Sequence, residues 1–309
     1  MPKFEVSKSI IINASAEKMF KILNDFSHWQ AWSPWLIQDP EAKVSLVDGN
    51  KAYSWEGTRT GTGTMKIVNE ALNKSIDYKL EFLKPWKSKA DVRFELSTVD
   101  KGATKLTWSM NSSLPFFMFW MKNMMIALIG MDYKRGLNLL KDYSEDGKVN
   151  SQLEFVGLST VEGCRYIGIK TTCKANEVAT KMEADFGVLM DFIGKDEAIS
   201  AEKPFTMYHK WDLVKGEVAY TSAVKVNNMP LNLPATFVSG DRPNTKVYTI
   251  KHTGPYHHMG NAWSTLYSMA QAKEITVNKK IPAFEVYSNS PRAVEPNELV
   301  TEVHLPVKS

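Results

Sequence analysis

The sequence predicts an α+β protein of two domains, in which a strongly curved antiparallel sheet around a long helix precedes a doubled βαββ unit with pseudo-twofold symmetry. Three observations lead to this fold class. The chain has 309 residues, about the length of two domains. Strand patterns surround one early helix between residues 4 and 110, and a long helical pattern follows them. In the second half, one short motif recurs 81 residues later.

The first half is predicted to run strand, helix, six strands and long helix. Apolar residues alternate along residues 4–12, and Ser15 then offers a cap for an amphipathic helix that contains Met19, Phe20 and Leu23. Six further alternating patterns follow between residues 44 and 110. An antiparallel sheet of this length has to curve around something, and the helix that follows is the natural filler.

That helix contains the most apolar stretch of the chain, LPFFMFWMKNMMIALIGM at residues 114–131. Helical spacing places five apolar residues on one face, which we expect to turn inward: Phe117, Met121, Met124, Leu128 and Met131. A transmembrane span is not expected, because Lys122 in the middle of the stretch costs about 2.5–3.5 kcal/mol on the insertion scale. Peripheral membrane contact stays open as an alternative to a buried or cavity-lining helix.

Bulky side chains are concentrated in the same half. Seven of nine tryptophans and nine of fifteen methionines precede residue 150. Methionine adapts to varied ligands, and tryptophan supplies flat apolar walls. This composition favours a ligand cavity, but a bulky, filled core explains it as well.

Two segments, INASAEKMFKILNDFSHWQAWSPW and SSLPFFMFWMKNMMIALIGMDYKRGLNLL, together with the element order, resemble the START-like (SRPBCC) helix-grip superfamily, and within it the polyketide cyclase/lipid-transport group. The resemblance covers residues 1–147. It implies a hydrophobic cavity between the sheet and the last helix, but no particular reaction. The candidate cavity residues that it implies are Trp29, Trp32, Trp55, Trp108, Phe117 and Met121.

Polar residues 148–154 form a linker to a second domain at residues 155–309, where the repeat lies. RYIGIKT at 165–171 resembles KVYTIKH at 246–252, and each copy continues into a helix and two strands. The predicted architecture is (βαββ)₂ with two helices on one face of the sheet. We expect the opposite face to lie open at the midline, where a small ligand would bind.

The two copies of the repeat differ at a position of chemical interest. Aligning TSAV at 221–224 with TEVH at 301–304 places Ser222 opposite Glu302, so one copy has a carboxylate where the other is neutral. Glu285 and Tyr287 share one face of the preceding strand and could bring a second carboxylate and a phenol nearby. The alternative is that both glutamates are solvated residues of an outer face.

Three further segments, IKHTGPYHHMGNAWSTLY, PAFEVYSNSPR and ELVTEVHLPVK, resemble the GyrI-like effector-binding domain family over residues 155–308. In related multidrug-sensing regulators, an acidic residue of the final strand meets cationic lipophilic ligands in an aromatic pocket. The resemblance therefore implies Glu302 as the acid, with Tyr287, Tyr256 and Trp263 as pocket aromatics. Some stand-alone members resemble hydrolases, and this implies Glu302, Glu285 and Tyr287 as catalytic residues, with glutamate as general base.

Several other classes are not expected. The formal charge of +4 is spread without a basic stripe, and no DNA-reading helix is found, so nucleic acid is not a predicted partner. No metal is predicted, because His252, His257 and His258 lack supporting ligand spacing, and no cofactor motif is present. Two cysteines and the absence of a signal-peptide pattern predict a cytoplasmic location.

The sequence thus predicts a protein with two pockets for hydrophobic, possibly cationic small molecules, acting as a sensor, carrier or sequestering protein. The alternative is a cofactor-free hydrolase that acts on a lipophilic electrophile with a pocket glutamate. The oligomeric state is left open.

Overall fold

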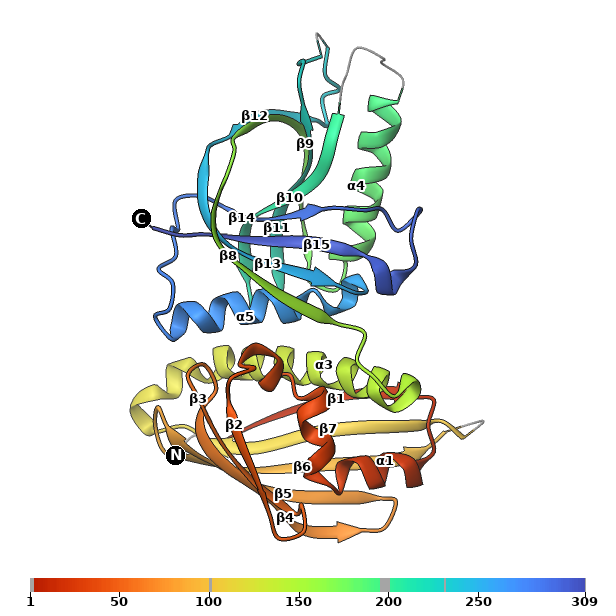
Figure 1. Ribbon diagram of the computed structural model, residues 1–309, viewed down its shortest axis with the longest axis vertical. Helices are drawn as coiled ribbons and strands as arrows, with labels where there is room; N and C mark the ends of the chain where they lie inside the picture. Colours follow the sequence, from red (N-terminus) through yellow and green to blue (C-terminus); the bar gives the residue numbers. More distant parts are fainter. Residues whose placement is uncertain (1–2, 100–101, 195–200, 231, 309) are drawn as a thin grey trace. The chain divides into compact units, whose positions relative to one another are not determined.

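The computed structural model describes residues 3–99, 102–194, 201–230 and 232–308 (Figure 1). The chain divides into two compact units. Unit 1 comprises the residues up to Gln152 together with His257–Ala272, and unit 2 comprises Leu153–Tyr256 and the residues from Lys273 onward. Each unit contains one antiparallel sheet, which confirms the predicted α+β class.

Unit 1 has the predicted element order. Its strands form a seven-stranded sheet in the order β1-β7-β6-β5-β4-β3-β2, in which every pairing is antiparallel. Its elements are β1 (Lys3–Ile12), α1 (Ala16–Leu23), η1 (Phe26–His28), α2 (Trp29–Trp32), η2 (Leu36–Gln38), β2 (Lys43–Val47), β3 (Ala52–Gly57), β4 (Gly61–Ala71), β5 (Ser75–Lys84), β6 (Ser88–Thr98), β7 (Thr104–Ser113), η4 (Phe116–Met121) and α3 (Lys122–Asp146).

Helix α3 covers one face of this sheet (Figure 1), but it does so with a different side from the one predicted. Tyr133, Leu137 and Leu140 are buried, and Ile126 and Ile129 pack against the same core at helical spacing. The predicted inward face is wrong, since Phe117, Met124, Leu128 and Met131 are exposed. None of the described helices combines the length and the apolar character that crossing a bilayer requires.

The space between α3 and the sheet holds aromatic rings that pack directly on one another. The indoles of Trp29 and Trp32 lie 4.5 Å apart, and the ring of Trp108 stacks on Tyr133 at 4.0 Å. Trp55 is buried beside Tyr53 at 5.4 Å. Such ring pairs contribute about 0.5–1.5 kcal/mol each beyond the area that they bury. The packing supports the filled core that the tryptophan-rich composition left open.

Unit 2 contains an eight-stranded antiparallel sheet in the order β12-β9-β11-β10-β14-β15-β13-β8. Two of its strands, β8 and β12, were not predicted, and β8 begins inside the predicted linker at Gln152. The elements of the second half of the chain are β8 (Gln152–Val161), β9 (Cys164–Lys174), α4 (Val178–Ile193), β10 (Ala201–Asp212), β11 (Glu217–Val226), β12 (Val238–Arg242), β13 (Thr245–Thr253), η5 (Tyr256–His258), α5 (Gly260–Gln271), β14 (Ala283–Tyr287), η6 (Pro296–Glu298) and β15 (Val300–Pro306).

The strand register defines which residues of the two repeats are equivalent. Ile169 pairs with Ser222, and its repeat partner Ile250 pairs with Val303. Ser222 is therefore equivalent to Val303, and the alignment of Ser222 with Glu302 was wrong by one residue. Because side chains alternate between faces along a strand, a slip of one residue moves a side chain to the other face of the sheet.

The midline of the repeat lies between β10 and β14, where Thr206 pairs with Glu285. The face of the sheet opposite to Glu285 was predicted to be open to a ligand. This prediction is wrong, because side chains cover that face. Phe205, Met207 and Phe284 are buried there in one cluster, and the guanidinium of Arg242 lies 4.3 Å from the ring centre of Phe284.

Candidate functional site

A carboxylate lies buried at the centre of the sheet of unit 2. Glu285 on β14 is only 4% exposed, although isolated buried carboxylates are strongly disfavoured. Its neighbour across the midline is Thr206 on β10, which is also buried. The carboxylate form of Glu285 therefore needs hydrogen-bond donors next to it to be stable in the folded protein.

Two tyrosines supply such donors. The hydroxyl of Tyr208 donates to Oε2 of Glu285 at 3.0 Å, and the hydroxyl of Tyr287 donates to the same oxygen at 2.8 Å. Burial, followed by the charge of Glu285, raises the pKa of both phenols well above the ordinary value. Both phenols therefore stay protonated and act as donors across the physiological pH range.

Helix α4 and the 3₁₀ helix η5 complete the surroundings. The ring of Phe186 meets Tyr287 edge-on at 5.6 Å, and the ring of Tyr256 meets it at 5.8 Å. The Sδ atom of Met182 lies 3.2 Å from the hydroxyl of Tyr287. Tyr256 is exposed along one side, so it forms the rim of the site. We call Thr206, Tyr208, Tyr256, Glu285 and Tyr287 the midline cluster.

The midline cluster combines a buried carboxylate with aromatic rings. A buried negative charge gains most from a counter-charge, and the faces of aromatic rings attract cations. Tyr256 lies close enough to Glu285 that the carboxylate adds to the burial that raises the pKa of its phenol. The cluster thus offers one negative charge among aromatic rings.

Of the three predicted catalytic residues, the structure brings two together. Glu285 and Tyr287 share one face, whereas Glu302 follows Thr301 on β15 and points to the opposite face of the sheet. There its Oε2 lies 3.5 Å from Nε2 of His304. Hydrogen bonding from His304 lowers the pKa of Glu302 against the opposing effect of partial burial. Glu302 is therefore a half-exposed acid with its own partner.

The predicted pocket aromatics are divided in the same way. Tyr256 and Tyr287 contact one another, whereas Trp263 lies on α5 and stacks on Tyr267 at 6.2 Å. Tyr208 was missed. A signal for it exists in the sequence, because TMY at 206–208 and EVY at 285–287 occupy equivalent places in the repeat. Only the strand register reveals this match.

A second carboxylate, Asp185, belongs to α4 and contacts the sheet. Asp185 accepts a hydrogen bond from the hydroxyl of Thr171 at 2.9 Å, and the Ser222 hydroxyl lies 3.4 Å from the same oxygen. Burial nevertheless raises the pKa of Asp185 above its ordinary value. This carboxyl group is therefore held in a place that disfavours its charge.

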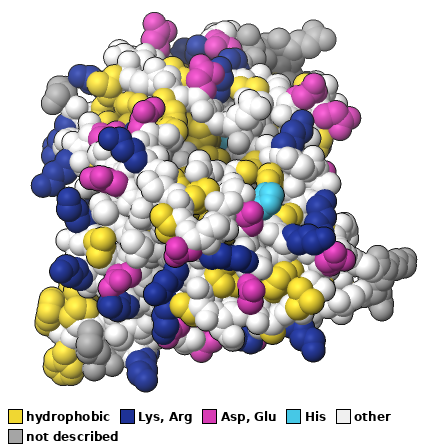
Figure 2. Space-filling view, turned by 60° about the horizontal axis from the view of Figure 1, so that its bottom comes forward, with side chains coloured by type: hydrophobic (Ala, Val, Ile, Leu, Met, Phe, Trp, Pro, Cys, Tyr) yellow, Lys and Arg dark blue, Asp and Glu magenta, His cyan; other side chains and the backbone are white. Residues whose placement is uncertain are grey.

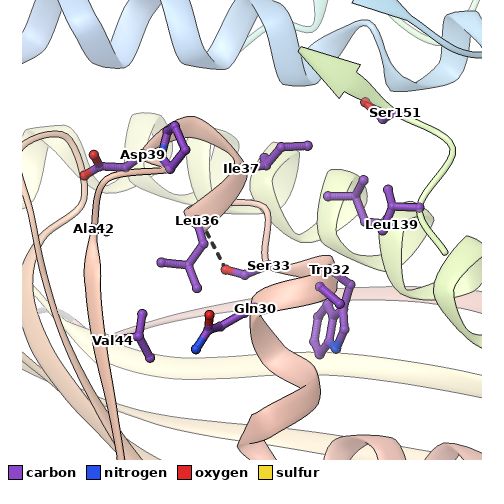
Figure 3. Close-up of a pocket in the computed structure, with 13 residues that line it drawn as sticks. Gln30, Trp32, Ser33, Leu36, Ile37, Asp39, Ala42, Val44, Leu139 and Ser151 are labelled. Atoms are coloured by element: carbon purple, nitrogen blue, oxygen red, sulfur yellow. Dashed lines mark hydrogen bonds between the residues drawn. The ribbon is translucent and has the colours of Figure 1, made fainter. Parts of the chain in front are cut away.

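Unit 1 carries a pocket of about 350 Å³ beside the loop that follows α1 (Figure 3). Leu36, Ile37, Val44 and Leu139 give it apolar walls, while the Ser33 hydroxyl accepts a hydrogen bond from the backbone of Leu36. Among the predicted cavity residues, Trp32 lines this pocket. The others are placed elsewhere: Trp29, Trp55 and Trp108 in the aromatic core, Met121 half-buried, and Phe117 on the surface.

Within the described ranges, one group of side chains has a spacing that could hold a metal ion. Ligand atoms of Asp142, His257 and His258 lie within 4.8 Å of one another. Asp142 already accepts hydrogen bonds from Nε2 of His258 at 2.7 Å and from the backbone of Asn150 at 3.0 Å. The carboxylate therefore has partners of its own, and the absence of a metal stays a prediction.

Comparison with known families shows a protein with two small-molecule binding domains. Residues 3–145 match the family described as polyketide cyclase/dehydrase and lipid transport, and residues 156–308 match the GyrI-like small molecule binding domain. The chain thus joins an N-terminal domain of the START-like (SRPBCC) family to a C-terminal GyrI-like domain, as its sequence motifs predict.

Solved structures resemble each half at low identity. The C-terminal domain of EcmrR is 16% identical, with 52% of this chain and 98% of that chain covered and a TM-score of 0.45. SAV2435 bound to tetraphenylphosphonium is 17% identical, with 50% and 94% covered and a TM-score of 0.39. A START superfamily protein from Mycobacterium smegmatis is 20% identical, with 47% and 99% covered and a TM-score of 0.35. A comparison with curated protein sequences gave no match.

Proposed function

We propose that this protein binds lipophilic organic cations at the midline cluster of its GyrI-like domain, with Glu285 as the counter-charge. The single observation that carries the proposal is a buried carboxylate that is 4% exposed and held by two phenol donors among aromatic rings. Burying a charge in this way costs free energy in the empty protein, and a bound cation offsets that cost.

The two phenols fix the position of the Glu285 carboxylate. Tyr208 and Tyr287 both donate to Oε2 of Glu285, and two donors occupy the two lone pairs of that oxygen. Oε2 can therefore not take a proton from an attacking water unless a phenol moves away, so a hydrolase would have to use Oε1, the other oxygen of Glu285, as its general base. This arrangement supports a receptor that acts as a sensor, carrier or sequestering protein, with the hydrolase as the second candidate.

The proposal is tested by Glu285→Gln in the full-length chain, with tetraphenylphosphonium as the probe and isothermal titration calorimetry as the measurement. The amide keeps the size of the side chain and an oxygen for the two phenols, but it removes the charge. Removing one partner of a buried charge pair costs about 2–5 kcal/mol, so affinity for the cation should fall at least about tenfold. Affinity for triphenylphosphine oxide, which is neutral, should change little.

Glu302→Gln is the matched control, because it removes a carboxylate from the opposite face of the same sheet. It should leave both affinities unchanged. If Glu302→Gln weakens cation binding and Glu285→Gln does not, the binding site lies on the other face and the proposal is wrong. Circular dichroism and Tm establish that both variants are folded.

A further inference from the structure

Four large aromatic side chains stand exposed in the 3₁₀ helix η4, just before α3. Phe116, Phe117, Phe119 and Trp120, here called the aromatic tip, are each between 60% and 77% exposed. Folded proteins seldom expose a contiguous apolar patch of this kind unless it has a binding role. Figure 2 shows hydrophobic side chains gathered at the lower left, on the side where Figure 1 draws the beginning of α3.

The local fold explains why these rings point outward. Leu114 is buried, and the chain then enters the 3₁₀ helix η4, in which Met118 packs against the core. A 3₁₀ helix has three residues per turn, so residues three apart eclipse one another. The rings of Phe116 and Phe119 accordingly lie 6.2 Å apart on one side. Met118 therefore packs against the core, whereas the rings of the aromatic tip remain exposed to solvent.

The β5–β6 hairpin ends on the same side of the sheet as the aromatic tip. Ser88 pairs with Phe82 and Ala90 pairs with Ser112, so the β5–β6 turn lies at the same end of the sheet as the exit of β7 towards η4. This turn exposes Leu83 and Trp86. Exposed apolar side chains from two separate segments thus lie at the same end of the sheet of unit 1.

The charges of these two segments indicate the kind of partner. Residues 83–89 and 114–131 contain four lysines and no acidic residue: Lys84, Lys87, Lys89 and Lys122. Of these, Lys89 pairs with Glu81 at 2.7 Å, while Lys84 and Lys87 are exposed. Aromatic rings with lysines beside them are typical of surfaces that lie at the boundary of an anionic bilayer.

We infer that the aromatic tip and the β5–β6 turn form a docking surface for an anionic phospholipid bilayer. The rings enter the headgroup region, and Lys84 and Lys87 lie against lipid phosphates. A surface of this kind, which enters only the headgroup region, makes a peripheral and reversible contact. This inference is independent of cation binding at the midline cluster.

The test is co-sedimentation of the full-length chain with vesicles of phosphatidylcholine, with and without phosphatidylglycerol. We expect binding to the anionic vesicles that weakens as salt is raised, because salt screens the lysines. Phe117→Ser/Trp120→Ser should lower the partition coefficient at least about tenfold, since each ring loses a large apolar area for burial. Lys84→Gln/Lys87→Gln should lower it several-fold for the anionic vesicles alone.

Val68→Ser/Leu72→Ser is the matched control. It removes two exposed apolar side chains, one near the end of β4 and one in the β4–β5 turn, at the other end of the same sheet. Partitioning should then match the unsubstituted chain. Tm should be unchanged in all three variants, because the substituted side chains are exposed.

Two results would overturn the inference. One is equal vesicle binding by the unsubstituted chain and Phe117→Ser/Trp120→Ser. The other is an absence of vesicle binding together with a dimer, seen by analytical ultracentrifugation, that this double variant converts to a monomer. The second result would assign the aromatic tip to a second copy of the chain.

Discussion

Asp185 illustrates at the scale of one residue how unit 2 holds carboxyl groups away from water. Its oxygen accepts a hydrogen bond from Thr171 and has Ser222 nearby, yet burial outweighs these contacts and its pKa is raised. The folded state therefore favours the protonated form more than the unfolded state does. The resulting contribution to stability is fully present below the unfolded pKa and is lost as pH rises through the folded pKa.

Asp185→Asn is expected to change the pH dependence of stability in that direction. The amide cannot ionise, so the Tm of the variant relative to the unsubstituted chain should rise as pH increases from about 3 to 7. Thermal unfolding followed by circular dichroism at several pH values measures this difference. Asp191→Asn, an exposed site on the same helix, is the control. A Tm difference for Asp185→Asn that stays constant over the whole range would contradict the prediction.

Single residues also mark the limit of what the sequence predicts about the site. Glu285, Tyr287 and Tyr256 were identified as candidates, and the structure places all three in the midline cluster. Glu302, which the family resemblance implied as the acid, lies on the opposite face of the sheet from Glu285, and only the strand register shows this. Tyr208 contributes from β10, and only strand pairing shows that β10 and β14 are neighbours.

At the scale of an element, α3 depends on close packing at a glycine. A Cβ atom built on Gly136 would lie 2.7 Å from Cζ3 of Trp108 and 3.0 Å from Cγ of Pro34. Both neighbours belong to the rigid aromatic core and its adjoining loop. A glycine inside a helix usually costs about 1 kcal/mol relative to alanine, but here it permits the helix to approach the sheet.

Gly136→Ala is therefore expected to destabilise the protein despite the higher helix propensity of alanine. Overpacking costs about 1–3 kcal/mol, which exceeds the gain in propensity. Gly187 on α4 is the matched control, because a Cβ atom there meets nothing within 4 Å. Gly187→Ala should raise the free energy of unfolding in urea and Gly136→Ala should lower it. If both variants are stabilised, the packing argument fails.

The helix was predicted correctly as an element, but its orientation was not. Phe117 and Met121 belong to the 3₁₀ helix η4, whose three residues per turn shift the phase relative to the α-helix that follows. Apolar residues also cover most sides of the helix before Asp132, so periodicity alone does not select a face. The buried positions Tyr133, Leu137 and Leu140 in the more polar second half show the true inward side.

At the scale of the whole molecule, the chain has one proposed surface in each unit. The midline cluster belongs to unit 2 and the aromatic tip to unit 1. The sequence predicted this two-part organisation because strand alternation and the repeat are local patterns. The strands β8 and β12 were missed, since they join the outer edges of a sheet whose extent only long-range pairing defines.

The two surfaces are expected to function independently. Glu285→Gln should leave vesicle partitioning unchanged, and Phe117→Ser/Trp120→Ser should leave the affinity for tetraphenylphosphonium unchanged. Both measurements use the full-length chain. A change of more than about threefold in either crossed measurement would show that the surfaces are energetically coupled, by about 0.65 kcal/mol or more.

Tyr208 and Tyr287 occupy matching positions in the two copies of the repeat, yet both hydroxyls reach the same oxygen. The repeat has two equivalent positions at its midline, Thr206 and Glu285, and only one of them carries an acidic side chain. The midline cluster therefore carries its carboxylate on one side only, although the strands around it pair in matching register. A ligand with a single cationic end would therefore bind there in one orientation.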